Sequence, residues 1–328
     1  MPDDTKQNVL FPEDEPESVG SELVPLRGSR SDVSDEKLRR LLEFRFSTED
    51  GESRDLGFTL PTLIYCTLPH RRSTEQSYRR QDPYTGARLE LFAPTEVGLP
   101  FGSISRLFLA RVMTSVVQTN RRTIYLGRSW RTAAENLGLA TSGPGLTRFQ
   151  DHVARCFYAT FTLEMRSGEA DPSRQSRYLR RFNVLSAAKL PPAIEGFSGI
   201  QWSPEVEVDE AFYRALTEGP RVPFDFAALR ALSGSPLGMD LYLLLNYRVF
   251  SIRKPLQLPF VELMQRFGGS YGDDANGVRT FKRRLMPQLL AIKALWPDLK
   301  VDVVRGGLQL QPGRPHVPSL GPGRNDPD

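Results

Sequence analysis

The chain has 328 residues, of which 39% are hydrophobic and 25% are charged. This composition is ordinary for a soluble globular protein, and no stretch approaches the ~20 consecutive apolar residues of a membrane-spanning helix. Because the length is about twice that of a usual single domain, we expect two folded units with extensions. The only cysteines, Cys66 and Cys156, are too few for a disulfide or zinc framework, which favours the reducing cytoplasm.

Charge is distributed unevenly along the chain. Residues 1–60 carry 8 basic and 15 acidic side chains, a net charge of −7, whereas residues 100–190 carry 14 basic and 5 acidic side chains, a net charge of +9. Only 7 of the 43 basic residues are lysine, and arginine is the better group for bidentate contacts with phosphates and guanine edges. Genomic base composition is an alternative explanation for the arginine excess, but it does not explain the clustering. The pattern indicates a polyanionic partner for the middle of the chain.

The first part of the chain is rich in acidic side chains and poor in apolar ones. We therefore expect residues 1–55 to be a disordered acidic extension, with a short helix over 34–44 as an alternative. The apolar run 60–68 predicts a strand, residues 82–86 a turn, and the alternating residues 88–93 a second strand. These strands would lie at the edge of the first folded unit.

A sequence of helical and strand-like patterns follows from Gly102. A long helix is succeeded by a short strand over 122–126, a helix capped by Ser129, and a third helix after the glycine-rich turn 142–145. Residues 161–185 then alternate in two runs that are separated by a polar turn. Helix, strand, helix, turn, helix and hairpin is the order of a winged helix, a helix-turn-helix variant with a β-hairpin wing.

The second half of the chain repeats this pattern of elements. A long helix over 236–251 precedes a strand over 256–258, helices over 260–267 and 278–296, and a tight hairpin around Gly306. Pro287 lies inside the last helix, where we expect a kink because proline removes a backbone hydrogen bond.

We therefore predict an α+β protein with tandem winged-helix domains and a disordered acidic N-terminal extension. The predicted parts are the extension over 1–55, a basic first winged-helix domain with a possible dimerisation arm over 56–192, a second DNA-binding winged-helix domain over 193–312, and a flexible tail over 313–328.

The third helix of the first unit is the best candidate for a recognition helix, because its predicted outward face directly follows a glycine-rich turn. A merely solvated face is the alternative, since any amphipathic helix has one. The neighbouring hairpin favours DNA contact, because arginines accumulate there with few acids to neutralise them. The candidate DNA-binding residues of this unit are Thr147, Arg148, Asp151 and Arg155 on the helix and Arg166, Arg174, Arg177, Arg180 and Arg181 on the hairpin.

The last helix of the second unit is the matching candidate, because polar and basic residues lie away from its apolar positions. These candidates are Arg279, Thr280, Lys282, Arg283 and Arg284. The aromatic residues of both helices fall on the apolar faces, so we expect them to pack in the core and not to stack on bases.

Motifs that carry catalysis are absent from the sequence. The three histidines, His70, His152 and His316, include no pair at metal-ligand spacing, and no phosphate-binding loop occurs. Gly143-Pro144-Gly145 lacks the third glycine of a dinucleotide fingerprint, and residues 196–199 are one residue short of a nucleophile elbow. We expect a non-catalytic protein without metal or cofactor; an enzyme whose site is assembled only in space is the alternative.

Several strings of residues resemble the RepA-type plasmid replication initiators. The most specific is 98–107 (GLPFGSISRL), followed by 124–127 and 137–139. Residues 67–70 are similar to the short arm of that family, and residues 308–312 and 315–317 resemble its closing strand and proline-rich end. The resemblance covers residues 58–317 and leaves out the acidic first 55 residues.

This resemblance implies a cytoplasmic bacterial protein that binds direct repeats in double-stranded DNA at a plasmid origin, promotes local duplex opening, and recruits the host replicative helicase and initiator proteins. It also implies a homodimer in equilibrium with a monomer and no membrane association. A winged-helix transcriptional regulator that binds an operator, without a replication role, is the alternative. Two non-identical units in one chain favour asymmetric direct repeats over a palindrome.

Overall fold

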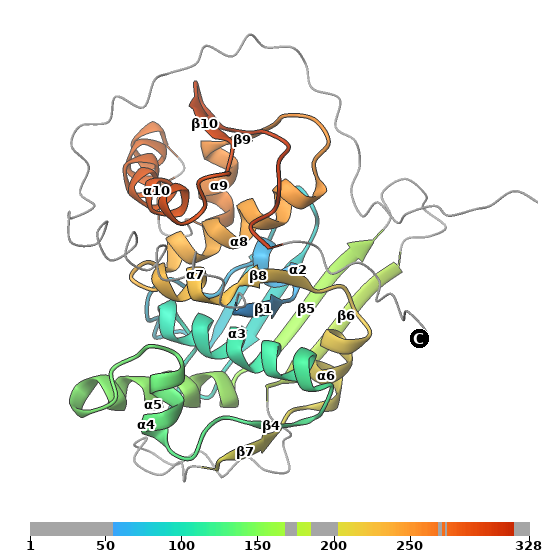
Figure 1. The fold of residues 1–328 in the computed structure, drawn as a ribbon, viewed down its shortest axis with the longest axis vertical. Coiled ribbons are helices and arrows are strands. Elements are labelled where there is room, and N and C mark those ends of the chain that lie inside the picture. Colours follow the sequence, from blue (N-terminus) through green and yellow to red (C-terminus); the bar gives the residue numbers. More distant parts are fainter. Residues whose placement is uncertain (1–54, 168–175, 185–202, 268–270, 273, 318–328) are drawn as a thin grey trace, which may run out of the picture.

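The computed structural model describes residues 55–167, 176–184, 203–267, 271–272 and 274–317, which are coloured in Figure 1. The acidic extension and the alternative helix over 34–44 lie outside the described residues, except for Asp55. In the described part, no helix is both long and apolar enough to cross a membrane.

The elements of the first half occur in the predicted order from α3 onward. They are β1 (Leu56–Thr59), α2 (Pro61–Tyr65), β2 (Ser77–Gln81), β3 (Arg88–Phe92), α3 (Gly102–Thr119), β4 (Thr123–Tyr125), α4 (Trp130–Asn136), α5 (Gly143–Tyr158), β5 (Thr160–Ser167) and β6 (Ser176–Asn183). The helix, strand, helix, helix and hairpin expected between residues 102 and 185 are therefore confirmed as elements.

The strand predicted over 60–68 is wrong, because residues 61–65 of that run form the short helix α2. Pro61 occupies the first turn of this helix, where its missing N–H costs nothing and its fixed φ suits the helix. A short continuous apolar run does not distinguish a buried strand from a buried helix, since both place most of their side chains in the core.

The elements of the second half occur in the predicted order from α8 onward. They are β7 (Glu205–Glu207), α6 (Glu210–Thr217), β8 (Val222–Asp225), α7 (Phe226–Ala231), α8 (Pro236–Ser251), β9 (Leu256–Pro259), α9 (Phe260–Phe267), α10 (Ala275–Leu295), β10 (Val301–Val304) and β11 (Gly307–Leu310). The series from α8 to β11 repeats the series from α3 to β6, and Pro287 lies within the single helix α10.

The two series pair their strands differently. In the second half, β9 joins the closing hairpin in a three-stranded sheet of order β10-β11-β9. In the first half, the hairpin β5–β6 instead extends the sheet β2-β3-β5-β6, and β4 pairs with β7 from later in the chain. The repeat is therefore one of element order and not of strand pairing.

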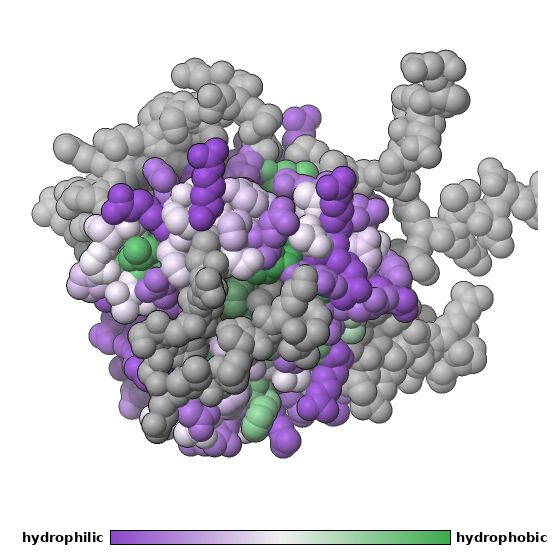
Figure 2. Space-filling model, turned by 90° about the horizontal axis from the view of Figure 1, so that it is seen from below, coloured by the Kyte–Doolittle hydropathy of each residue, from purple (hydrophilic) through white to green (hydrophobic). Residues whose placement is uncertain are grey.

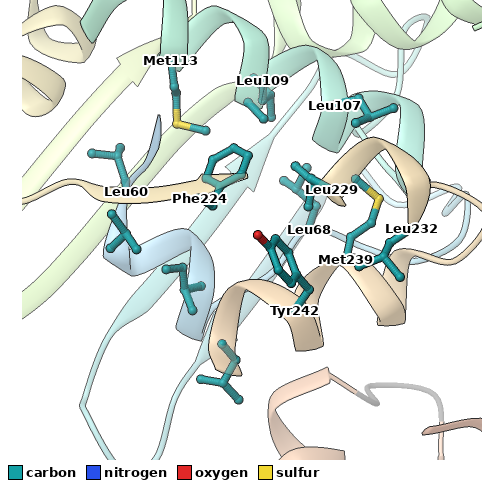
Figure 3. Close-up of a cluster of buried hydrophobic side chains, with 14 of the residues drawn as sticks. Leu60, Leu68, Leu107, Leu109, Met113, Phe224, Leu229, Leu232, Met239 and Tyr242 are labelled. Carbon is teal, nitrogen blue, oxygen red and sulfur yellow. The ribbon is translucent and has the colours of Figure 1, made fainter. Parts of the chain in front are cut away.

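The two halves pack closely against each other (Figure 1). β1 pairs with β8, α2 and α3 contact α8, and α6 contacts β6. One apolar cluster runs through both halves: Figure 3 shows Leu107 and Met113 of α3 beside Phe224, Leu229 and Met239 of the second half. The division near residue 192 stays a prediction, and β7, α6 and β8, which follow it, pack on elements of the first half.

The residues after β11 return to the second half. The ring of His316 stacks on Trp296 with the ring centroids 5.3 Å apart, and its Nδ1 lies 2.8 Å from the hydroxyl of Tyr242. Val317 is buried. Residues 313–317 were expected to belong to a flexible tail. They include side chains that pack on Tyr242 of α8 and on Trp296, directly after α10.

Candidate nucleic-acid interface

The helices α4 and α5 follow one another across a short connection, and their ends are set by local sequence. The hydroxyl of Ser129 accepts a hydrogen bond of 3.2 Å from the backbone N–H of Thr132 and so caps α4. Gly138 follows α4 with φ of +67°, a conformation that ends a helix and suits glycine. Pro144 stands in the first turn of α5, as the missing N–H of proline allows.

The N-terminal half of α5 presents the predicted recognition face. Thr147 and Arg148 are exposed, whereas the next residue, Phe149, is fully buried. Asp151, one turn further on, is half-buried. The exposed part of the predicted face therefore begins near the start of α5 and ends after about two turns.

The predicted exposure of Arg155 is wrong. Arg155 is only 3% exposed, because the segment before α3 covers this part of α5. Its Nε donates to Oδ2 of Asp151 over 2.8 Å, and its guanidinium lies over the ring of Phe101. Helical periodicity places Arg148 and Arg155 on the same side of α5, but it contains no information about a loop that covers only one of them.

The region around β4 and α4 carries three further exposed arginines that the sequence reasoning did not single out. Arg121 and Arg128 flank β4, and Arg131 lies in the first turn of α4. Figure 2 views the molecule from the side on which β4 and β7 lie in Figure 1, and the described part of this face is mainly hydrophilic. These arginines belong to no periodic pattern, so only the net charge of the block indicated them.

The neighbouring Arg122 differs from these three because acidic side chains neutralise it. Its guanidinium lies 3.0 Å from a carboxylate oxygen of Glu207 and 3.0 Å from one of Glu210. We therefore leave Arg122 out of the candidate interface.

The hairpin β5–β6 is formed as predicted, with Arg166 opposite Arg177, Leu163 opposite Arg180, and Thr162 opposite Arg181. Arg181 is exposed. Arg174 lies outside the described residues, and only the backbone positions of Arg166, Arg177 and Arg180 are described. In Figure 1, β5 runs away from α5, so the last part of β5 and the first part of β6 lie on a different side of the unit from α5.

The helix α10 presents the second predicted face. Arg279, Arg283 and Arg284 are exposed, and Thr280 and Lys282 are half-buried. The Nζ of Lys282 lies over the ring of Phe260, with 5.1 Å to the ring centroid. Three arginines in the N-terminal half of α10 are therefore available to an anionic partner.

Several titratable groups are held in their neutral forms by burial. Burial raises the pKa of the Cys66 and Cys156 thiols to about 12 in each case, so neither is a thiolate at neutral pH. Burial also lowers the pKa of His152 to about 4. Among the described residues, no group of three His, Cys, Asp or Glu side chains is placed to hold a metal ion.

Comparison with known proteins identifies the family. The family model for the plasmid-encoded RepA protein matches residues 99–292, which is more than half of the chain. The chain therefore belongs to the family of plasmid-encoded RepA proteins, the replication initiator family that the sequence resembles. No curated protein matches the chain closely enough to be called a relative.

A solved structure shows a related fold. A crystal structure of domains 2 and 3 of RctB is similar with a TM-score of 0.50 and 17% sequence identity, over 79% of this chain and 97% of that chain. A second crystal structure of RctB domains 2–3 matches with a TM-score of 0.42 and 17% identity, over 77% of this chain and 96% of that one. The first of these supports an α+β fold that extends across both halves of the chain.

Proposed function

We propose that this chain is a non-catalytic plasmid replication initiator, which binds direct repeats at a plasmid origin through two winged-helix units. The observation that carries the proposal is the repeated order of elements with exposed arginines on the third helix of each series. These are Arg148 on α5 and Arg279, Arg283 and Arg284 on α10. Membership of the RepA family gives this pattern its functional setting.

Each third helix has the properties of a helix that reads the major groove. It buries one face in its own unit and exposes guanidinium groups that match guanine O6 and N7. Exposed arginines around β4 and α4, such as Arg121 and Arg131, are suited to the phosphates that position the protein on the duplex.

The packing between the halves favours an asymmetric site. Buried ion pairs link Arg106 to Asp240 and Arg266 to Asp82, and each joins one half to the other. Two different reading helices held in a fixed relation match a site with two different halves, and repeated copies of such a site are direct repeats. Local duplex opening, recruitment of the host replicative helicase and initiator proteins, and a dimer–monomer equilibrium belong to the proposal through the family alone.

The proposal is tested by supplying the chain in trans to a small plasmid that carries only short direct repeats and an adjacent AT-rich segment, both taken from the DNA that flanks its gene. We expect replication that depends on the chain, together with a footprint over each repeat. The control is the same plasmid with scrambled repeats. Footprints on an operator in the absence of replication would instead favour the transcriptional regulator.

A further inference from the structure

Arg155 lies in a cradle formed by the segment that leads into α3. Its Nε makes the ion pair with Asp151, and its Nη1 donates to the carbonyl oxygen of Leu99 over 3.5 Å. The guanidinium carbon lies 5.4 Å from the ring centroid of Phe101. An arginine that is 3% exposed and held from three directions is part of the packing between α5 and this segment.

Gly98 allows the segment to come this close. Its φ is +79°, a conformation that glycine adopts readily, and a Cβ atom at this position would lie 2.5 Å from Nη1 of Arg155. The guanidinium therefore occupies the space where any other residue would place its side chain.

A second side chain of α5 is held by the same segment and by the first turn of α3. Nδ1 of His152 lies 2.9 Å from Oγ of Ser105, and the ring centroids of His152 and Phe101 are 4.5 Å apart. His152 and Arg155 are three residues apart and therefore lie on adjacent turns of one side of α5. The C-terminal half of the helix is thus fixed at two successive points.

We propose that Arg155 is a positioning residue for DNA recognition: it docks α5 on residues 98–105 and thereby sets where Arg148 meets the duplex. This inference rests on the proposed DNA-binding function of α5. A helix is stiff over two turns, so an anchor at Arg155 determines the position of Arg148, about 10 Å along the axis. Readout of a base edge requires placement to within a fraction of an ångström, whereas attraction to phosphates does not.

The experiment compares the wild-type chain with two variants that keep every charge, Phe101→Leu and Arg155→Lys. It also includes Arg155→Met, which removes the charge of Arg155, and Arg148→Ala, which removes the proposed base contact. Each is titrated with a duplex that carries the repeat and with a scrambled duplex over a range of salt concentrations. Measurements are made well below the melting temperature and are normalised to the folded fraction, so that a loss of stability alone leaves the affinity unchanged.

If Arg155 positions α5, both Phe101→Leu and Arg155→Lys should lower affinity for the repeat by roughly tenfold, the order of one lost base contact. Affinity for the scrambled duplex should change less than about twofold, and the slope of log affinity against log salt should match that of the wild type, because no phosphate contact is removed.

Two results would overturn the inference while leaving the proposed function in place. One is a Phe101→Leu variant that binds the repeat as tightly as the wild type. The other is an Arg155→Met variant that weakens both duplexes equally and reduces the slope by about 0.9, as expected for a direct phosphate contact. If the wild-type chain binds no duplex DNA, the proposed function fails, and the inference fails with it.

Discussion

Arg106 on α3 and Asp240 on α8 join the two halves of the chain through a buried two-pronged ion pair. Nε and Nη2 of Arg106 each donate to a different carboxylate oxygen over 2.8 Å, and His70 Nε2 lies 2.7 Å from Oδ2 of Asp240. Arg106 also donates to the carbonyl oxygens of Leu68, Pro69 and Gly102. Burial alone would raise the pKa of Asp240, but Arg106 and His70 reverse this effect, so the pKa is lowered.

The first prediction concerns this pair. Asp240→Ala should reduce the free energy of unfolding by about 3–5 kcal/mol, because the variant leaves the guanidinium of Arg106 buried without its counter-charge. The measurement is urea unfolding at neutral pH. The double variant Arg106→Met/Asp240→Leu is the control and should recover part of the loss, since no buried charge remains. A loss below about 1 kcal/mol for Asp240→Ala is typical of a solvent-exposed pair, and it would contradict the role of this ion pair in joining the two halves.

The second prediction concerns the acid side of the stability curve. The folded-state pKa of His152 is lowered to about 4, first of all by burial, so the unfolded chain binds the extra proton more readily. Stability contributed by this group is complete above about pH 6.5 and is lost as the pH falls towards 4, by about 3 kcal/mol at most. Urea unfolding of the wild type and of His152→Gln across this range should give curves that converge at low pH. Parallel curves would show that His152 does not titrate in this way.

The third prediction compares two glycines with positive φ. At Gly306, with φ of +87°, no described atom other than those of Gly306 and its two chain neighbours lies within 4 Å of the position that a Cβ atom would take, whereas a Cβ on Gly98 would meet Arg155. Gly306→Ala should cost about 1–2 kcal/mol of backbone strain, and Gly98→Ala should cost at least about 1 kcal/mol more because it also overpacks the cradle. Thermal melting checks the order. Equal losses would mean that Arg155 moves aside without cost.

The fourth prediction concerns the acidic N-terminal segment. Its charge and scarcity of apolar residues indicate no role in the core, and the first contact of the described chain is the carbonyl oxygen of Asp55, which accepts from Phe226 N–H over 2.7 Å. A chain that begins at residue 50 should keep the melting temperature of the full chain and the same DNA footprint. If truncation unfolds the first half, part of this segment belongs to the fold.

Local sequence signals predicted most of the elements. The bounds of α9 agree with the predicted helix over 260–267, and Ser129 and Gly138 begin and end α4 as expected, because capping and chain termination depend on neighbouring residues. Strands β1, β2 and β8 were missed. They are short, and β8 is stabilised by its pairing with β1, which is more than 160 residues away in the sequence.

The candidate interface was predictable only in part, for a similar reason. Exposure of Arg148 follows from the period of α5, but burial of Arg155 depends on the loop around Phe101, and the inclusion of Arg121 depends on where β4 lies. Contacts between distant segments decide which members of a basic block face solvent, and periodicity within one helix does not contain them.

Salt-dependent binding of duplex DNA by the wild-type chain and by Arg148→Ala tests the central claim most directly. For the wild type, log affinity should fall steeply with log salt, by about 0.9 for each phosphate contact. Arg148→Ala should lose about 1–3 kcal/mol on the repeat and much less on a scrambled duplex. A flat salt dependence, or an equal loss on both duplexes, would contradict the account of α5 as a reading helix.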